Sequence, residues 1–221
     1  MRLSSVAFAV ALLTLPLVAH AAVDTSKDDA PPPVVIRASD RAQLDRVEAY
    51  LNSLTTVSAN FVQYADLGDG SKGEVTGTFK LWRPGRLRID YAAPSGDFIV
   101  ADGSVIHQWD SQMKQASQTS ISGALPGFLL KKGIRFQGDD VTVTGVHHPV
   151  PTEVEVSVRS AKDPDAGELT LRLSDVPLRL LGWRVRDVQG LTTAVTLSDL
   201  QTGVSFNAAD FVFKKPAVRG K

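Results

Sequence analysis

Residues Gly77–Asp110 read GTFKLWRPGRLRIDYAAPSGDFIVADGSVIHQWD, and this stretch decides the fold of the chain. Its strand-like runs, separated by turn signals, are Thr78–Trp82, Arg86–Tyr91, Asp97–Val100 and Ser104–Trp109. The Arg-Pro-Gly turn suits a tight reversal, because proline presets φ and glycine tolerates positive φ. In the second run Leu87, Ile89 and Tyr91 share one face, which is the period of a half-buried antiparallel strand. The stretch therefore predicts an antiparallel meander that curls around an apolar interior.

A single long helix is expected before this meander. Ser39 or Asp40 can serve as its N-cap. Four apolar residues then recur at spacings of three and four, and these are Leu44, Val47, Leu51 and Leu54. Such spacing gives the helix one apolar stripe, which needs a surface to cover.

Strand patterns fill most of the remaining chain. The other expected strands are Val57–Ala65, Met113–Gln118, Val141–Val146, Glu153–Ser160, Glu168–Ser174, Leu181–Asp187 and Thr192–Leu200. In one of them Leu181, Trp183 and Val185 are expected on one face. About ten strands indicate one large antiparallel sheet, and a sheet of that size curls. The predicted fold class is mainly β (α+β), with a strongly curved sheet whose concave face is covered by the helix and a second segment.

That second segment is Thr119–Gly133, which interrupts the series of strands. It is apolar at Leu125, Phe128, Leu129 and Leu130, and its glycines and proline exclude a long regular helix. Two interpretations stay open at this point. The segment is either a lid that moves or a short core helix that does not.

The N-terminus has the features of a secretory signal peptide. Arg2 precedes an apolar run at Val6–Val18, and Ala19-His20-Ala21 fits a small-x-small cleavage pattern. The run is short for a membrane span of about 20 residues, which makes an uncleaved anchor the weaker alternative. The expected organisation is a signal peptide at 1–21, a flexible proline-rich lead-in at 22–39, one domain at 40–216 and a short tail at 217–221.

Composition excludes several classes of site. The chain contains no cysteine, so it has no disulfide, no zinc–thiolate site and no thiol nucleophile. It carries 24 Lys+Arg and 24 Asp+Glu, and loss of the expected signal peptide removes only Arg2. A near-neutral chain without a basic stripe argues against nucleic acid as a partner.

Signals for catalysis or metal binding are weak. His147 and His148 are adjacent, and adjacent residues of a strand point to opposite faces, so they chelate a metal poorly. Paired carboxylates for glycoside hydrolysis could be Asp90 and Asp187, but both lie on or at the end of alternating strands and nothing in the sequence indicates a raised pKa for either. The chain has no G-x-S-x-G nucleophile elbow and no P-loop. We therefore expect no enzyme activity, no metal and no cofactor.

Short pieces along the chain resemble, in order and spacing, the LolA family of periplasmic outer-membrane lipoprotein carrier proteins. The matching pieces are Phe61-Val62-Gln63, Gly77…Arg83-Pro84, Tyr91…Pro94, Val100-Ala101-Asp102-Gly103, Asp187…Gly190 and Asp210-Phe211-Val212-Phe213…Pro216. The resemblance covers the chain from the first helix to the final FVFKKP. It implies an unclosed β-barrel, in which helices form a lid over an apolar cavity.

The resemblance also implies a function. Such a protein is a periplasmic chaperone that binds the acyl chains of lipoproteins and carries them from an inner-membrane ABC transporter complex to the outer membrane, where an acceptor is possible. A carrier that shuttles is expected to be a monomer. Burying each acyl methylene is worth about 0.8 kcal/mol, so bare acyl chains cannot cross an aqueous compartment.

The resemblance implies the role of one residue, and the apolar pattern suggests the residues of the lid and of the cavity. Arg83 is implied to lock the lid, and an arginine suits this role because its fork can bond several carbonyls at once. The alternative for Arg83 is a solvated turn residue. The lid residues would be Leu125, Phe128, Leu129 and Leu130. The acyl-chain cavity would be lined by Phe61, Phe79, Leu81, Leu87, Ile89, Tyr91, Ile99 and Trp183, although each of them singly suits ordinary core packing.

Three other functions remain open for this fold. The first is a lipid-sensing regulatory domain that signals through a protein partner. The second is the lipid-anchored outer-membrane acceptor, against which the absence of cysteine argues. The third is a carrier of another lipid or glycolipid, which the sequence does not separate from a lipoprotein carrier.

Overall fold

The computed structural model describes residues 36–66, 70–121 and 125–217. The expected signal peptide (1–21), most of the lead-in and the last residues of the tail lie outside them. The described residues form one eleven-stranded antiparallel sheet and one α-helix, α1 (Ala38–Ser53). No helix among them is long and apolar enough to cross a membrane.

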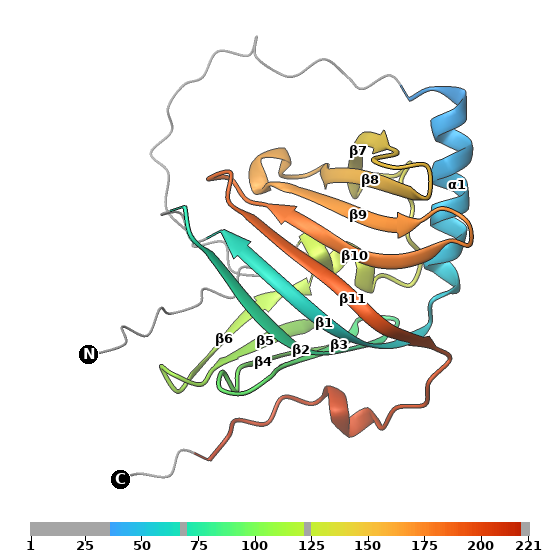
Figure 1. The fold of residues 1–221 in the computed structure, drawn as a ribbon. Helices are drawn as coiled ribbons and strands as arrows, with labels where there is room; N and C mark the ends of the chain where they lie inside the picture. The colour runs from blue at the N-terminus through green and yellow to red at the C-terminus, as the bar shows by residue number, and fades with distance from the viewer. Residues whose placement is uncertain (1–35, 67–69, 122–124, 218–221) are drawn as a thin grey trace.

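The sheet is strongly curved and open along one side (Figure 1). Its strands are β1 (Thr56–Asp66), β2 (Lys72–Trp82), β3 (Arg86–Tyr91), β4 (Phe98–Asp102), β5 (Val105–Asp110), β6 (Gln115–Ser120), β7 (Val141–His147), β8 (Glu153–Ser160), β9 (Glu168–Ser174), β10 (Arg179–Arg186) and β11 (Thr192–Thr202). Their order in space is β6-β5-β4-β3-β2-β1-β11-β10-β9-β8-β7, so the first and last strands meet in the middle. The two edge strands, β6 and β7, do not pair with each other in the described chain. The predicted unclosed, curved antiparallel sheet is confirmed.

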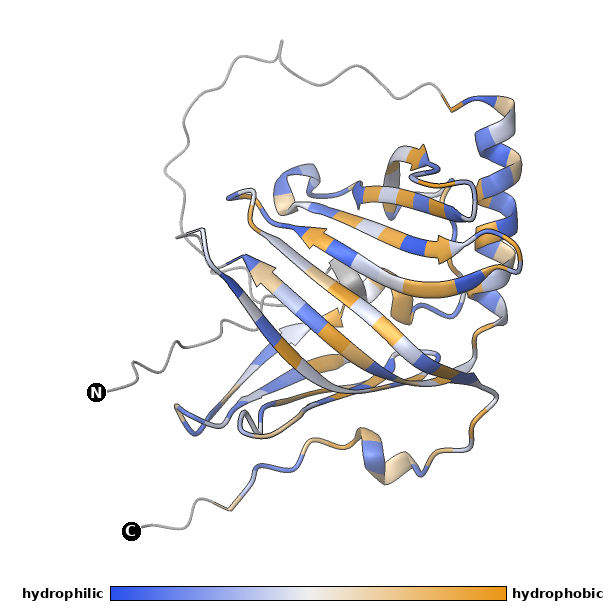
Figure 2. Ribbon diagram, viewed as in Figure 1, coloured by the Kyte–Doolittle hydropathy of each residue, from blue (hydrophilic) through white to orange (hydrophobic). Residues whose placement is uncertain are grey.

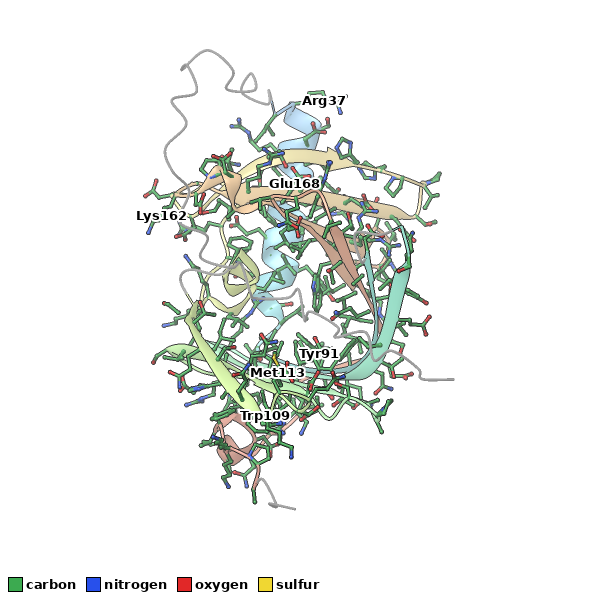
Figure 3. All side chains as sticks on the ribbon, turned by 90° about the vertical axis from the view of Figure 1, so that its left-hand side faces the viewer. Arg37, Tyr91, Trp109, Met113, Lys162 and Glu168 are labelled. Atoms are coloured by element: carbon green, nitrogen blue, oxygen red, sulfur yellow. The ribbon has the colours of Figure 1, made fainter. Side chains whose placement is uncertain are left out.

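Alternation of apolar and polar residues gives the sheet a buried concave face. Bands of opposite hydropathy succeed one another along most strands (Figure 2). In β3 every second residue is buried, beginning with Leu87. Tyr91 lies inside the curve of the sheet, whereas Lys162 points outward (Figure 3). The core therefore fills the space between the sheet and α1.

Helix α1 closes part of this concave side with its apolar stripe. Leu44, Val47 and Leu51 are at most 1% exposed, as their spacing predicted. The expected N-cap was wrong: the cap position is Arg37, which makes no side-chain capping bond. Asp40 instead falls in the first helical turn, where it pairs with Arg37 Nε at 3.0 Å and faces the positive end of the helix dipole.

Several strand boundaries differ from the prediction, and two of the differences have a visible local cause. Strand β2 begins at Lys72 instead of Thr78, and its glycine-rich first half pairs with β1. Gly77 is needed there, because a Cβ at this position would lie 2.6 Å from the Phe61 ring and 2.2 Å from the Asp90 carbonyl oxygen. Strand β6 begins at Gln115 instead of Met113, because the Met113 amide donates to the Asp110 carboxylate (2.7 Å) in the preceding turn.

A bulge in β10 corrects the expected facing of that strand. The register with β9 shifts between Leu180 and Gly182. Leu180 and Trp183 are consequently both buried, and Leu181 is not on their face. An extra residue at a bulge resets the alternation of side chains, which a strict period of two cannot anticipate.

The C-terminal segment after β11 covers part of the convex face, opposite the core (Figure 1). Phe211, in a short 3₁₀ helix (Ala208–Phe211), is 1% exposed and contacts Trp82 at 5.7 Å between ring centroids. Lys80 Nζ pairs with Asp210 at 3.3 Å. Arg88 Nη1 donates to the Asp210 carbonyl (3.1 Å), and Arg88 also pairs with Asp90. Asp90 therefore serves this convex contact, and Asp187 accepts amide bonds within its own hairpin turn, so the two carboxylates do not form a pair.

Asp102 organises the β4–β5 hairpin and predicts a pH dependence. Its Oδ1 accepts the Ser104 and Val105 amides, both at 3.0 Å, and these bonds lower the pKa of Asp102, with a smaller contribution from His107. A lowered folded-state pKa means that the carboxylate stabilises the fold above the ordinary aspartate pKa of about 3.9 and that this is lost as pH falls through the folded value. We expect Asp102→Asn to have a lower urea midpoint than the unmodified protein at pH 6, with the gap closing toward pH 3. A gap independent of pH would contradict this assignment.

Candidate functional site

An apolar cavity lies where α1, the β2–β3 hairpin, β10 and the 3₁₀ helix η2 (Leu125–Leu130) meet. Its lining residues are Leu51, Leu54, Val57, Phe79, Leu81, Arg83, Leu87, Ile89, Leu129, Leu130, Leu180 and Trp183. Eleven of these twelve are apolar, and Arg83 is the charged one. The cavity volume is about 30 Å³, which is room for one or two water molecules.

The pleat of the β2–β3 hairpin builds the floor of this cavity. Phe79 pairs with Ile89, and Leu81 pairs with Leu87. Residues directly opposite in an antiparallel ladder point to the same face, so these four side chains share one apolar surface. Trp183 joins this surface from the other half of the sheet and contacts Phe79 at 5.5 Å between ring centroids.

The structure brings together five of the eight residues predicted for the cavity wall, and the lid residues Leu129 and Leu130 with them. Phe61, Tyr91 and Ile99 belong to the same continuous core but do not line this cavity. Phe61 and Tyr91 pack edge to face at 5.5 Å, and the Tyr91 hydroxyl donates to Gln63 at 3.2 Å. Burial raises the pKa of Tyr91, which keeps this hydroxyl a neutral donor.

Sequence reasoning missed four lining residues. Leu51 and Leu54 were assigned to the helix stripe, and that stripe was the available signal for them. Leu180 was hidden by the bulge in β10. Val57 was placed in a strand without a role, although its inward alternation with Ala59 and Phe61 was readable.

The segment η2 lies against the core as a short 3₁₀ helix. Phe128 and Leu130 are each 4% exposed, Leu129 is half-buried, and the Phe128 ring contacts Phe136 at 5.8 Å. The side chain of Leu125 lies outside the described residues. Thr119 and Ser120 belong to β6, so the interrupting segment begins later than the expected Thr119.

Arg83 joins α1 to η2. Its Nε donates to the Leu129 carbonyl (2.8 Å) and its Nη1 donates to the Leu51 carbonyl at the end of α1. The neighbouring Gly85 amide donates to the Leu130 carbonyl at 2.8 Å. Burial lowers the pKa of Arg83 to about 10, so the guanidinium is still charged at neutral pH. Hydrogen bonds from charged donors contribute about 1.5–3 kcal/mol each, which makes this turn a strong attachment point for η2.

Trp183 places an unused donor in the cavity wall. Its side chain is 4% exposed, and its Nε1 has no hydrogen-bond acceptor among the described residues. An unsatisfied buried donor costs about 1–3 kcal/mol. The wall therefore contains two polar groups. The donors of Arg83 are hydrogen-bonded and hold η2, whereas the indole N–H of Trp183 has no acceptor among the described residues.

A second, larger hollow of about 430 Å³ lies at the β8–β9 and β10–β11 turns and shares no lining residue with the apolar cavity. It contains both acidic and basic side chains, and Arg159 already pairs with Glu168 at 3.3 Å. Elsewhere in the described chain, no group of three histidine or carboxylate side chains is placed to hold a metal. The apolar cavity is accordingly the candidate site.

Comparison with known proteins places this geometry in a family. The family model described as "Outer membrane lipoprotein carrier protein LolA" matches residues 52–214. The chain belongs to the LolA family. The matched span covers the whole sheet, the Arg83 turn and η2.

Curated relatives agree with this placement, and a solved structure shares the fold. The chain is 28% identical over 177 residues to an outer-membrane lipoprotein carrier protein of Chromohalobacter salexigens, covering 78% of this chain and 82% of the relative. It is 26% identical over 181 residues to the protein of the same name from Cupriavidus necator, covering 79% and 85%. A DUF1329 family protein from Desulfovibrio piger shares the fold alone, with a TM-score of 0.51, 11% identity and coverage of 78% and 96%.

Proposed function

We propose that this protein carries acylated lipoproteins through the periplasm toward the outer membrane, with the acyl chains buried in the apolar cavity. The observation that carries the proposal is an almost wholly apolar cavity under a segment that Arg83 attaches to the sheet, in a chain of the LolA family. The names of its relatives support the same role.

Acyl chains can enter only if the cavity expands. Its volume of about 30 Å³ is far below the roughly 300–1,000 Å³ of pockets that hold small apolar ligands. In this proposal the wall that moves is η2, together with the end of α1. Arg83 bridges these two elements by hydrogen bonds, so breaking its bonds would let them separate. In this proposal Arg83 locks the lid, and Leu125, Phe128, Leu129 and Leu130 form it.

The closed arrangement makes release possible. A ligand shifts an equilibrium only by its different affinity for the two states, so every bond that stabilises the closed state lowers the net affinity for cargo. The two bonds to η2, from Arg83 to Leu129 and from Gly85 to Leu130, together with the bond from Arg83 to α1, thus oppose the burial of acyl methylenes. Expansion would bring Phe61, Tyr91 and Ile99, which lie in the same core, to the acyl chains.

The remaining parts of the route belong to the same proposal. The chain is exported, loses residues 1–21, receives lipoproteins from an inner-membrane ABC transporter complex and delivers them, as a monomer, to the outer membrane or to an acceptor there. Binding and release make or break no covalent bond, so the proposal assigns no catalytic residue. The cavity wall supplies burial, and the Arg83 turn supplies closure.

A binding measurement tests this function. We expect the delipidated protein to take up a tripalmitoylated lipopeptide at one-to-one stoichiometry in native mass spectrometry. The same peptide without acyl chains is the matched control and should not bind. Equal binding of both peptides, or of neither, would overturn the proposal. A phospholipid or glycolipid retained from the periplasm in preference to the lipopeptide would instead favour a carrier of another lipid.

A further inference from the structure

We propose that the indole N–H of Trp183 binds a carbonyl oxygen of the cargo's acyl ester or amide linkage. The cavity would then recognise the acyl linkage and not hydrocarbon alone. This inference rests on the proposed function and extends it to the chemistry of the bound group.

Trp183 carries a buried hydrogen-bond donor that no described residue accepts from. Buried tryptophans usually have a hydrogen-bond partner for their N–H. Trp183 is 4% exposed and lines the cavity, yet its Nε1 has no acceptor among the described residues. The other polar group of the wall, Arg83, directs its donors to the carbonyls of Leu129 and Leu51. In the closed arrangement Trp183 is thus the polar group of the wall whose donor is unused.

Apolar neighbours restrict the indole of Trp183. Its neighbours across the sheet are Leu171 on β9 and Val195 on β11, and both are buried. The Phe79 ring packs against it at 5.5 Å. Apolar contacts on all these sides hold the indole in place, and a donor fixed in advance binds without a further ordering cost.

The apolar lining limits the class of ligand that the indole N–H of Trp183 can bind. A water molecule needs two to four polar partners, and eleven of the twelve lining residues are apolar. A carboxylate or phosphate would bring a further charge into a wall whose one charged group, Arg83, already donates to the Leu129 and Leu51 carbonyls, and burying a charge without a partner is strongly unfavourable. An ester or amide carbonyl needs only one hydrogen-bond donor, which the indole N–H supplies. The hydrocarbon attached to that carbonyl suits the apolar lining of the cavity.

The test compares two lipids that differ in the carbonyl. Dioctanoylglycerol carries ester carbonyls, and its dioctyl diether analogue carries only weakly accepting ether oxygens. From the usual contribution of a neutral hydrogen bond, we expect the unmodified protein to bind the ester about three- to tenfold more tightly. Replacing the indole of Trp183 by benzothiophene, which keeps the bicyclic ring and lacks the N–H, should abolish that preference. Trp109→Phe, on the β4–β5 side and outside the cavity lining, is the control and should keep it.

A second measurement needs no substitution. In the ¹H–¹⁵N spectrum of the unmodified protein, the Trp183 indole signal should move downfield with the diester and stay unchanged with the diether. Equal affinities for the two lipids together with an unmoved indole signal would overturn the Trp183 inference while the carrier function stands. Binding of neither lipid would overturn both.

Discussion

Arg83→Leu is expected to bind acyl cargo far more tightly than the unmodified protein and to release it far more slowly. The substitution removes the bonds to the Leu129 and Leu51 carbonyls, which exist in the closed arrangement. Two bonds from a charged donor contribute together about 2–4 kcal/mol after allowing for non-additivity, which corresponds to roughly 30- to 1,000-fold in affinity. The dissociation rate of a fluorescent tripalmitoylated peptide, measured by transfer to acceptor vesicles, checks the change directly.

Two further variants test whether slower release comes from the lost hydrogen bonds of Arg83 or from the lost positive charge. Arg86→Leu removes an arginine from the same hairpin, but Arg86 lies over the Trp82 ring at 4.7 Å from its centroid and makes no bond to η2 among the described contacts. It should release cargo at the normal rate. Arg83→Lys keeps the charge without the planar fork and should fall between the two. If Arg83→Leu released cargo as fast as the unmodified protein, Arg83 would be only a structural link between α1 and η2.

Arg83→Leu is also expected to be less stable than the unmodified protein in the absence of cargo. The Leu51 and Leu129 carbonyls lose a charged donor in Arg83→Leu, and the leucine cannot replace it. The free energy of unfolding without cargo should therefore fall while cargo affinity rises. A variant that merely damaged the fold would lose both, so opposite signs of the two changes distinguish a lock from a structural defect.

The predictable part of this fold rests on strict alternation. The β2–β3 hairpin could be read from the sequence because Leu87, Ile89 and Tyr91 alternate with charged residues, and one buried face determines the register. Errors arose where tertiary contacts overrode local signals. The glycines before Thr78 indicate a turn, yet Gly77 pairs with both neighbouring strands, and it is a glycine because the Phe61 ring and the Asp90 carbonyl lie where its Cβ would be.

The cavity was partly predictable for the same reason. Its β2–β3 floor follows from alternation, whereas the contribution of Leu180 depends on a bulge that has no clear signal in the sequence. The hydrogen-bond partners of Arg83 lie in two segments that are far from it in sequence, and an Arg-Pro-Gly turn by itself does not indicate either of them. The unpaired indole of Trp183 was not predictable, because a side chain without a hydrogen-bond partner leaves no pattern in a sequence.

Gly182→Ala is expected to destabilise the protein by about 3 kcal/mol, through a clash and through backbone strain. Gly182 has φ 149°, and an added Cβ would lie 2.0 Å from the Val195 carbonyl oxygen on β11. Both the clashing atom and its neighbours belong to the backbone of the central part of the sheet, so no side chain can move to make room. Urea unfolding followed by circular dichroism measures the loss.

Gly203→Ala is the matched control for the strain alone. Gly203 has φ 71°, and nothing lies within 4 Å of an added Cβ. Its substitution should cost only about 1 kcal/mol, the usual cost of a left-handed conformation for a residue with a Cβ. Equal losses in the two variants would show that the close approach of β10 to β11 does not constrain residue 182.

Gly182→Ala also tests how the fold positions the cavity wall. Because the bulge between Leu180 and Gly182 brings Leu180 and Trp183 into the wall together, relaxing it to admit a Cβ must shift both. Gly182→Ala should therefore weaken acyl binding and remove the preference for esters over ethers, and Gly203→Ala should change neither. Loss of stability with unchanged lipid selectivity would mean that neighbours such as Phe79 position Trp183 and the bulge does not.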